Sequence, residues 1–500
     1  MCSVSGLSDL WVRGVAANSG APSDVLLRLL QPQGRVAWQV LCQERGLPGD
    51  VVDAVVVHPE WAVRRFFARN RHVGAVQRSR LVDDRDGFVR ADLDAGPRPR
   101  VGRVEALPDD VVERLLTGRG PLAGDASVTV DEIRQELVSS GQISPFFLRR
   151  MWAHSDPLVR GFAAARWLWL GDEERDALLP DPVPAVRDAA RRHSRVLDPV
   201  AMEAELPEHS CHHRTLLLGN YAVSRAVAEA CLDRGRNLLS LATNPFTPPD
   251  VVARLARQAD PRVRERVAGR ADVGPVLLQA LAEDPDDGVR TRARVQPASR
   301  TWAQCRAVDR VYGQAAEDIG VVGEMAVEPD GEWYRACALS GHPLLRRVAV
   351  TWHRLPVPLM RRLADDADPQ VRHLLALNHP LAPPDALLDA FVQMPRQRAY
   401  LLTLDRLPRT GLRQLLGHAD PGVRALAAGD PALRPPPVAL LHDADAGVRR
   451  AAAAHPALPG EVVEALLWDG ATAEGAAANP GLGAGRLHRL LDRAAGLPSS

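Results

Sequence analysis

Residues 366–391 read DADPQVRHLLALNHPLAPPDALLDAF, and this stretch decides the fold expected for the chain. Its Asp-Pro pair at 368–369 is a helix N-cap followed by the one helical position at which proline costs nothing. Val371 and Leu375 then stand four residues apart, which is the spacing of a buried helical stripe. The His-Pro pair at 379–380 ends this helix, because the residue before a proline is pushed out of the α region. A Pro-Pro pair then starts a second helical run, so the unit is two short helices.

The same unit recurs along the chain, mostly every 24 to 27 residues. With the residue after the valine as the marker, the copies fall at 13, 38, 64, 90, 160, 187, 214, 238, 264, 290, 346, 372, 398, 424, 449 and, in degenerate form, near 475. Each helix is too short to bury its apolar side alone, so neighbouring units must stack to close a core. No copy shows the period-2 alternation of a strand. The sequence therefore predicts an all-α helical-repeat solenoid without a β-sheet.

Two stretches break the repeat and divide the chain into blocks. Repeat blocks are expected at 1–116, 141–297 and 336–500, with a helical insertion at 117–140 and an insertion or joint at 298–335. In the first insertion, Thr129 and Glu132 have capping-box spacing. In the second, a helix is expected near residues 302–312. Both insertions are interpreted as decorations or joints in one array.

The repeat resembles that of the leucine-rich repeat variant family. A period of about 26 residues is shorter than the 34 of tetratricopeptide repeats and the roughly 40 of HEAT repeats. The family pattern resembles Asp-Pro-x-Val-Arg-x-x-Val-Ala-x-Asn-Pro-x-x-Pro-Pro-x-x-Leu-x-x-Leu-Ala, which residues 366–391 follow closely and 260–284 more loosely. The resemblance implies a right-handed superhelix of α/α or α/3₁₀ units. Some members carry an N-terminal iron–sulfur segment with clustered cysteines, which is not carried over because the first 90 residues contain only Cys2 and Cys42.

Composition excludes several classes of protein. The 500 residues contain 62 basic side chains, all of them arginine, and 62 acidic ones, so the net charge is zero. A globally basic protein that coats nucleic acid is excluded, as is any chemistry that needs a lysine. No apolar run approaches ~18 residues, no export signal precedes the repeats, and the six cysteines lack paired spacing. We therefore expect a cytoplasmic protein with no membrane contact.

One cluster contains potential metal ligands. Residues 209–213 read His-Ser-Cys-His-His, but no second ligand pair follows at the spacing that zinc sites use. The cluster is interpreted as a polar loop before a helix. We expect neither a metal nor any other cofactor.

The marker arginine has two candidate partners. In six copies an aspartate lies four residues earlier, the favourable orientation for an ion pair within one helix. In a stacked array the same arginine can also reach an aspartate of the next unit and form a structural ladder. The ladder is preferred over a ligand-binding role.

The expected function is a non-enzymatic protein-interaction scaffold, because no catalytic motif is found. Two alternatives stay open: nucleic-acid binding through the arginine-rich stripe at about 254–310, and an enzyme or enzyme-accessory protein with a HEAT-like fold, which a short match at 159–165 suggests. The candidate partner-binding residues are Arg264, Arg266, Arg290, Arg292, Trp333 and Tyr334. Arg266 and Arg292 start a second arginine column, but this column ends because Val348 and Leu374 occupy the same position in later copies. Nucleic-acid binding is therefore not expected to exceed weak, non-specific association, and the protein partner is unknown.

Overall fold

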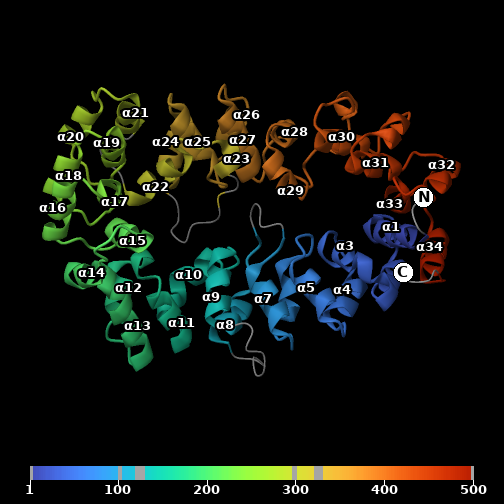
Figure 1. Cartoon of the computed structure of the whole chain (residues 1–500), viewed down its shortest axis with the longest axis horizontal. Coiled ribbons are helices and arrows are strands. Elements are labelled where there is room, and N and C mark those ends of the chain that lie inside the picture. The colour runs from blue at the N-terminus through green and yellow to red at the C-terminus, as the bar shows by residue number, and fades with distance from the viewer. Residues whose placement is uncertain are drawn as a thin grey trace. The chain divides into compact units, whose positions relative to one another are not determined.

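The structure is a computed structural model of the chain and describes residues 4–98, 104–118, 130–295, 301–319, 322 and 330–496. All regular elements in these ranges are short α-helices or 3₁₀-helices, and the ranges contain no strand. Figure 1 shows the helices following one another in chain order, and most contacts join helices that are close in the sequence. The all-α prediction is therefore confirmed, with contacts of the kind that a repeat produces.

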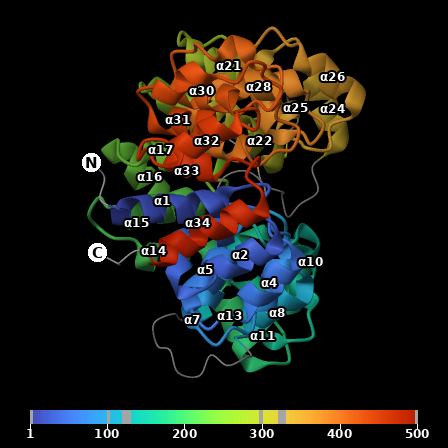
Figure 2. The same ribbon diagram turned by 90° about the vertical axis from the view of Figure 1, so that its right-hand side faces the viewer.

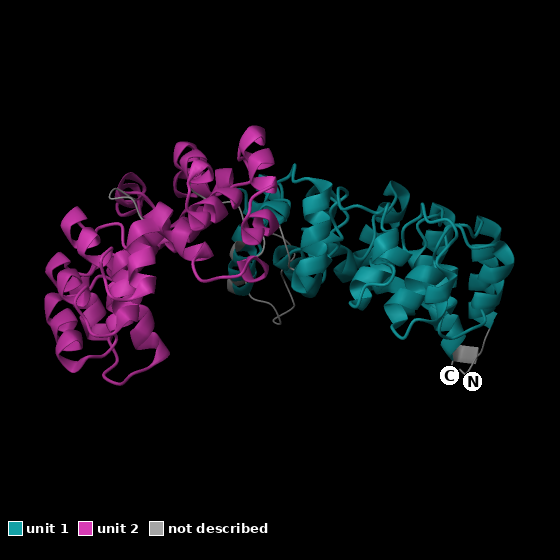
Figure 3. Cartoon of the chain, turned by 90° about the horizontal axis from the view of Figure 1, so that it is seen from above, with its two compact units in different colours: residues 1–144, 320–324, 375–500 teal, residues 145–319, 325–374 magenta. Residues whose placement is uncertain are grey.

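The helices form two compact units (Figure 3). Unit 1 contains residues 1–144, 320–324 and 375–500, and unit 2 contains residues 145–319 and 325–374. The first block expected from the sequence (1–116) thus lies in unit 1 together with residues 375–500 of the last block, whereas residues 336–374 of the last block belong to unit 2. The block boundaries themselves stay a prediction.

Unit 1 contains the following helices: α1 (Val4–Ala17), α2 (Ser23–Leu29), η1 (Pro32–Ala37), α3 (Trp38–Gln43), α4 (Gly49–Val56), α5 (Trp61–Ala68), α6 (Ala75–Arg78), η2 (Ser79–Leu81), α7 (Gly87–Ala95), α8 (Asp109–Thr117), α9 (Val130–Ser139), α28 (Pro384–Gln393), η6 (Pro395–Gln397), α29 (Arg398–Leu401), η7 (Arg413–Leu415), α30 (Pro421–Ala428), η8 (Val438–His442), α31 (Ala446–Ala453), α32 (Gly460–Leu466), α33 (Ala473–Ala477) and α34 (Ala484–Gly496).

Unit 2 contains α10 (Pro145–Arg150), η3 (Met151–Ala153), α11 (Pro157–Ala164), η4 (Trp167–Trp169), α12 (Asp172–Leu178), α13 (Pro184–Ser194), η5 (Arg195–Leu197), α14 (Pro199–Glu205), α15 (His212–Asn220), α16 (Arg225–Arg234), α17 (Leu238–Thr243), α18 (Pro249–Leu255), α19 (Pro261–Ala268), α20 (Pro275–Leu281), α21 (Asp287–Val295), α22 (Trp302–Val311), α23 (Ala316–Ile319), α24 (Gly331–Leu339), α25 (Pro343–Val350) and α26 (Val357–Ala364). Helix α27 (Pro369–Asn378) includes residues of both units.

One repeat, built on α19, shows why these residues form helices. The Asp260 side chain accepts a hydrogen bond from the Arg262 N–H at 2.9 Å, and Pro261 occupies the first helical turn. Val263 and Val267, four residues apart, are buried and pack in one core cluster with residues of α17, α18 and α21. The predicted capping and apolar spacing are therefore both confirmed in this repeat.

The marker arginines form the predicted ladder between units. In five copies Nε and Nη2 donate to the two carboxylate oxygens of an aspartate in the following turn, at 2.6–3.1 Å. The pairs are Arg64–Asp84, Arg160–Asp181, Arg264–Asp284, Arg346–Asp366 and Arg424–Asp443. Each aspartate also accepts the N–H two residues ahead at 2.8–2.9 Å, so one side chain fixes the turn and holds the preceding unit. The pair within one helix is not the arrangement adopted, because an aspartate such as Asp260 caps its helix instead.

A second ladder consists of buried asparagines at the ends of the first helices. Asn70, Asn244 and Asn479 each donate from Nδ2 to two carbonyl oxygens of the preceding repeat and accept the N–H two residues ahead. Their side chains are at most 1% exposed, so each one satisfies buried backbone groups that water cannot reach. The asparagine of the Asn-Pro motif therefore links consecutive units as well as ending a helix.

In unit 1 the first repeat stacks on the last. Asn18 donates to the carbonyl oxygens of Ala477 and Asn479 at 3.1 and 2.8 Å, as the other ladder asparagines do to the preceding repeat. A Cβ on Gly14, four residues before Asn18, would lie 2.3 Å from the Glu474 carbonyl oxygen, so α1 and α33 approach too closely for a side chain at this position. Figure 2 shows α1 beside α34. The two ends of the chain thus meet through an ordinary repeat junction.

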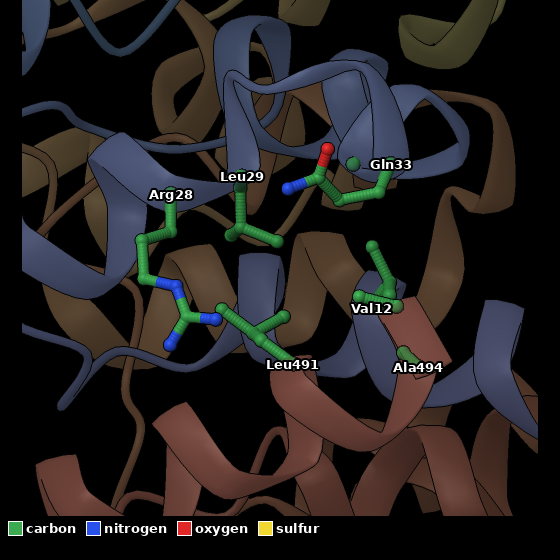
Figure 4. A pocket seen from close by; sticks show the side chains of 8 residues that line it. Val12, Arg28, Leu29, Gln33, Leu491 and Ala494 are labelled. Atoms are coloured by element: carbon green, nitrogen blue, oxygen red, sulfur yellow. The ribbon is translucent and has the colours of Figure 1, made fainter. Parts of the chain in front are cut away.

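Side chains around this junction complete it. The Trp11 indole N–H donates to the Leu467 carbonyl oxygen at 2.7 Å, and the Trp11 ring meets that of Trp468 edge to face. Arg28 of α2 donates to Asp492 of α34 at 2.6 Å. Between these helices, beside Leu491, lies a cavity of about 20 Å³ (Figure 4), which has room for about one water molecule. The junction is therefore closely packed.

The insertion helices were correctly placed. Helix α9 lies in the first insertion, although its expected capping residue Thr129 is outside the described residues. Helix α22 begins at Trp302, where Thr301 and Gln304 form a capping box. Across the described ranges, no helix combines the length and the apolar character needed to cross a bilayer.

Candidate functional site

Two of the four arginines predicted for partner binding are used within the fold. Arg264 donates to both oxygens of Asp284 and to the carbonyl oxygens of Gln258 and Ala259, which occupies four of its five N–H groups. Arg290 donates to the carbonyl oxygens of Asp284 and Pro285, and its Nη2 pairs with Asp287 at 2.9 Å. Both side chains serve mainly to hold turns and neighbouring units together.

The other two arginines, Arg266 and Arg292, depart from the pattern of the repeat. They stand two residues after the marker arginines Arg264 and Arg290. Two other copies place Val348 and Leu374 at this position, and both are fully buried. Arg266 is exposed and makes no hydrogen bond or ion pair with any described residue. Arg292 is only 3% exposed, so a charged group is buried at a position that the copies with Val348 and Leu374 fill with apolar side chains. The burial of this guanidinium therefore departs from the apolar packing of those two copies.

Gly269 makes the burial of Arg292 possible. A Cβ at this position would lie 2.8 Å from the Arg292 Nε, so any larger residue would displace the guanidinium. Arg292 also pairs through Nη2 with Asp309 of α22 and lies over the Tyr312 ring, with Cζ 5.0 Å from the ring centroid. Burial lowers the pKa of Arg292 to about 10, which leaves it charged at neutral pH. Its Nη1 is buried and has no hydrogen-bond partner.

These residues surround a pocket of about 170 Å³ between α19, α21 and the insertion helix α22. Arg270 and Trp302 form one wall, with the Arg270 Cζ 5.4 Å from the centroid of the indole ring. Arg270 itself is satisfied: it donates to both oxygens of Asp272 at 2.7–2.8 Å and to the carbonyl oxygens of Ala242 and Asn244. It therefore contributes shape to the pocket more than free charge.

An acidic side chain also lines the pocket. Glu265 reaches from α19 toward α21, where its Oε1 would lie 3.4 Å from a Cβ placed on Gly288. Tyr312 donates from its hydroxyl to the Gly288 carbonyl oxygen at 3.3 Å. Burial, followed by the neighbouring Glu265 carboxylate, raises the pKa of Tyr312 well above its ordinary value. Glu265 forms no ion pair with any described arginine, so its charge remains available at the pocket.

The two predicted aromatic residues lie apart from this pocket, in α24. Tyr334 is 5% exposed and packs between Trp333 and Trp352, with ring centroids 5.1 and 5.5 Å away. It therefore serves as core in this structure, while Trp333 is half-buried. A partner contact through Trp333 stays a prediction.

The His-Ser-Cys-His-His cluster forms the start of α15. The Cys211 Sγ accepts the Arg214 N–H at 3.4 Å as an N-cap, and His212 and His213 are exposed. Within the described part of the chain, no three His, Cys, Asp or Glu side chains gather in a way that could hold a metal ion.

Comparisons with known proteins do not extend this description. No model of a known protein family matches the chain, and no curated protein is detectably similar to it. The resemblance to leucine-rich repeat variants therefore rests on the repeat motifs alone.

Two residues of this site, Arg266 and Arg292, were predicted from the sequence. The stacking of Arg266 and Arg292 in neighbouring units was expected from their common repeat position. The contributions of Asp309 and Tyr312 were missed, because the sequence of α22 shows no copy of the repeat motif from which a register could be assigned. Gly269 was the available signal, since a glycine at a helix end facing the next unit leaves space that a large side chain can fill.

Proposed function

We propose that this chain is a non-enzymatic, cytoplasmic interaction scaffold built from a right-handed solenoid of repeats of the leucine-rich repeat variant type. The regularity of the two ladders supports this proposal, because a repeat array that stacks through its own side chains provides an extended binding surface. The observation that carries the proposal is that the Arg266 side chain is exposed and makes no hydrogen bond or ion pair with a described residue. Arginine is enriched at the energetic centres of protein interfaces, where its planar fork binds carboxylates.

The nucleic-acid alternative depends on the same arginine stripe and is weaker. Of its four stacked arginines, Arg264 and Arg290 already donate to carboxylates and carbonyl oxygens. Each such pair removes a charge that would otherwise neutralise a phosphate and release a counterion. A protein partner with an acidic contact therefore fits this surface better than a nucleic-acid backbone.

The test is affinity capture of the tagged full-length chain from its native cell, with quantitative mass spectrometry. Arg266→Glu reverses the charge at the proposed contact. Arg262→Glu is the matched control, because Arg262 lies one turn away on α19, is 74% exposed and pairs only with Asp260 beside it. We expect a protein enriched by the wild type and by Arg262→Glu to fall by about tenfold or more with Arg266→Glu.

Equal capture by the wild type and Arg266→Glu would contradict the proposal. Enrichment that disappears on nuclease treatment would instead favour the nucleic-acid alternative. Circular dichroism of each variant should match the wild type, since both positions are exposed.

A further inference from the structure

The buried guanidinium of Arg292 is incompletely satisfied. Asp309 engages Nη2, but Nη1 is buried without a partner, although the side chain is only 3% exposed. Leaving a buried donor unpaired is destabilising, and more so when the group is charged. Since Arg292 lines the pocket, a group bound there can accept this hydrogen bond.

The charges around the pocket cancel. Arg270 is neutralised through two hydrogen bonds by Asp272, which does not line the pocket. The remaining charged groups are two cations, Arg266 and Arg292, and two anions, Glu265 and Asp309. A dianion such as phosphate would add two negative charges to a neutral pocket and meet the two carboxylates there. A ligand that is neutral overall but carries separated charges would meet partners of the opposite sign at both ends.

The positions of these charged groups determine which end of a bound ligand carries the positive charge and which the negative charge. Asp309 is already paired with Arg292, which leaves Glu265, whose carboxylate interacts with the Tyr312 hydroxyl but with no described arginine, as the acceptor for a positive group. The unpaired donors are the Arg292 Nη1 and the exposed guanidinium of Arg266. The charges of Arg266 and Glu265 both affect the pKa of Arg292, and all three side chains line the same pocket.

The volume limits the size of the ligand. The pocket has a volume of about 170 Å³. Drug-sized ligands occupy pockets of about 300–1,000 Å³. A molecule with only a few non-hydrogen atoms fits.

We propose that this pocket binds a small zwitterion of the free α-amino acid class. Its carboxylate accepts hydrogen bonds from Arg292 and Arg266, and its ammonium group donates to Glu265. Charge-assisted and bidentate hydrogen bonds of this kind are the strongest that side chains provide. This inference goes beyond the scaffold function, because the site needs no protein partner to be occupied.

The experiment is isothermal titration calorimetry of the full-length chain with L-alanine, glycine and L-serine. Acetate, methylamine and inorganic phosphate serve as probes that carry only one of the two charges. We expect at least one amino acid to bind saturably, and each single-charge probe to bind about tenfold or more weakly, because one of the two charge-assisted contacts is lost. Arg292→Met and Glu265→Gln should each lower the affinity by about tenfold or more, whereas Arg262→Ala should not change it.

Arg292→Met is expected to fold, because other repeats carry buried apolar residues at the same position. Its thermal unfolding, measured without ligand, checks this expectation independently. Absence of binding by all three amino acids would overturn the proposal, as would phosphate or acetate binding that equals theirs. Unchanged binding by a folded Arg292→Met variant would also overturn it. Loss of amino-acid binding alongside unchanged partner capture would show that the pocket and the scaffold function are separate.

Discussion

The ladder pair Arg264–Asp284 provides a direct test of how the repeats are held together. Its two hydrogen bonds, at 2.7 and 2.9 Å, join side chains that are 13% and 8% exposed. Asp284→Ala removes both bonds and also the acceptor for the Asp286 N–H at 2.8 Å. Hydrogen bonds to charged groups contribute about 1.5–3 kcal/mol each, and the residual exposure reduces this value. We therefore expect Asp284→Ala to lower the free energy of unfolding by about 2–4 kcal/mol, and Arg264→Ala by a similar amount.

The double variant should cost less than the sum of the two single variants. A coupling energy of about 1–2 kcal/mol is expected from a double-mutant cycle, because each single variant leaves a mostly buried charge without its partner. Urea unfolding followed by circular dichroism gives the overall change, and native-state hydrogen exchange shows whether α19 and α21 are the helices that open. The exposed pair Arg262–Asp260 at the start of α19 is the control and should show much weaker coupling. Additive effects at Arg264 and Asp284, or coupling no larger than in the control, would refute the ladder as a stabilising device.

The remaining predictions concern the buried asparagines and the acid sensitivity of the ladder. Asn244→Ala removes three hydrogen bonds at 2.8 Å and leaves buried carbonyl oxygens unpaired, so unfolding should become easier by about 2–4 kcal/mol, whereas the exposed Asn220→Ala should have little effect. Asn18→Ala should cost as much as Asn244→Ala, and a negligible cost would show that the junction between the two ends of the chain does not form in solution. Hydrogen bonds from the ladder arginines hold the pKa of Asp181 and Asp284 below the ordinary value of 3.8, so the folded state favours their charged forms. This stability is present above that value and is lost as the pH falls below it; in urea titrations over this range, Asp284→Asn should weaken the dependence on pH.

The elements of the repeat were predictable because their causes are local. An Asp-Pro pair caps a helix through atoms two residues away, as the bond from Arg262 to Asp260 shows. The partner of Arg264 was harder to choose, since the sequence offers aspartates both four residues earlier and in the following unit. The choice is made by the turn, in which Asp284 is fixed by its own bond to the Asp286 N–H and faces the preceding repeat. The spacing of residues in the sequence does not show which of these aspartates faces Arg264.

The contact between the first and last repeats could not be read from the sequence, because it joins residues more than 450 positions apart. The contact nevertheless uses the same asparagine and glycine positions as a junction between consecutive repeats. Gly14 and Gly475 both stand four residues before a ladder asparagine, and at both a Cβ would lie 2.3 Å from a carbonyl oxygen of the adjoining unit. A terminal repeat normally needs a polar cap, because its outer face would otherwise expose the apolar surface that a neighbour covers. In unit 1 each end supplies that neighbour for the other, so the N-terminal repeat can keep the small and apolar residues of an internal one. The junction is therefore as much a part of the fold as any internal contact, and a variant that opens it would expose two apolar faces at once.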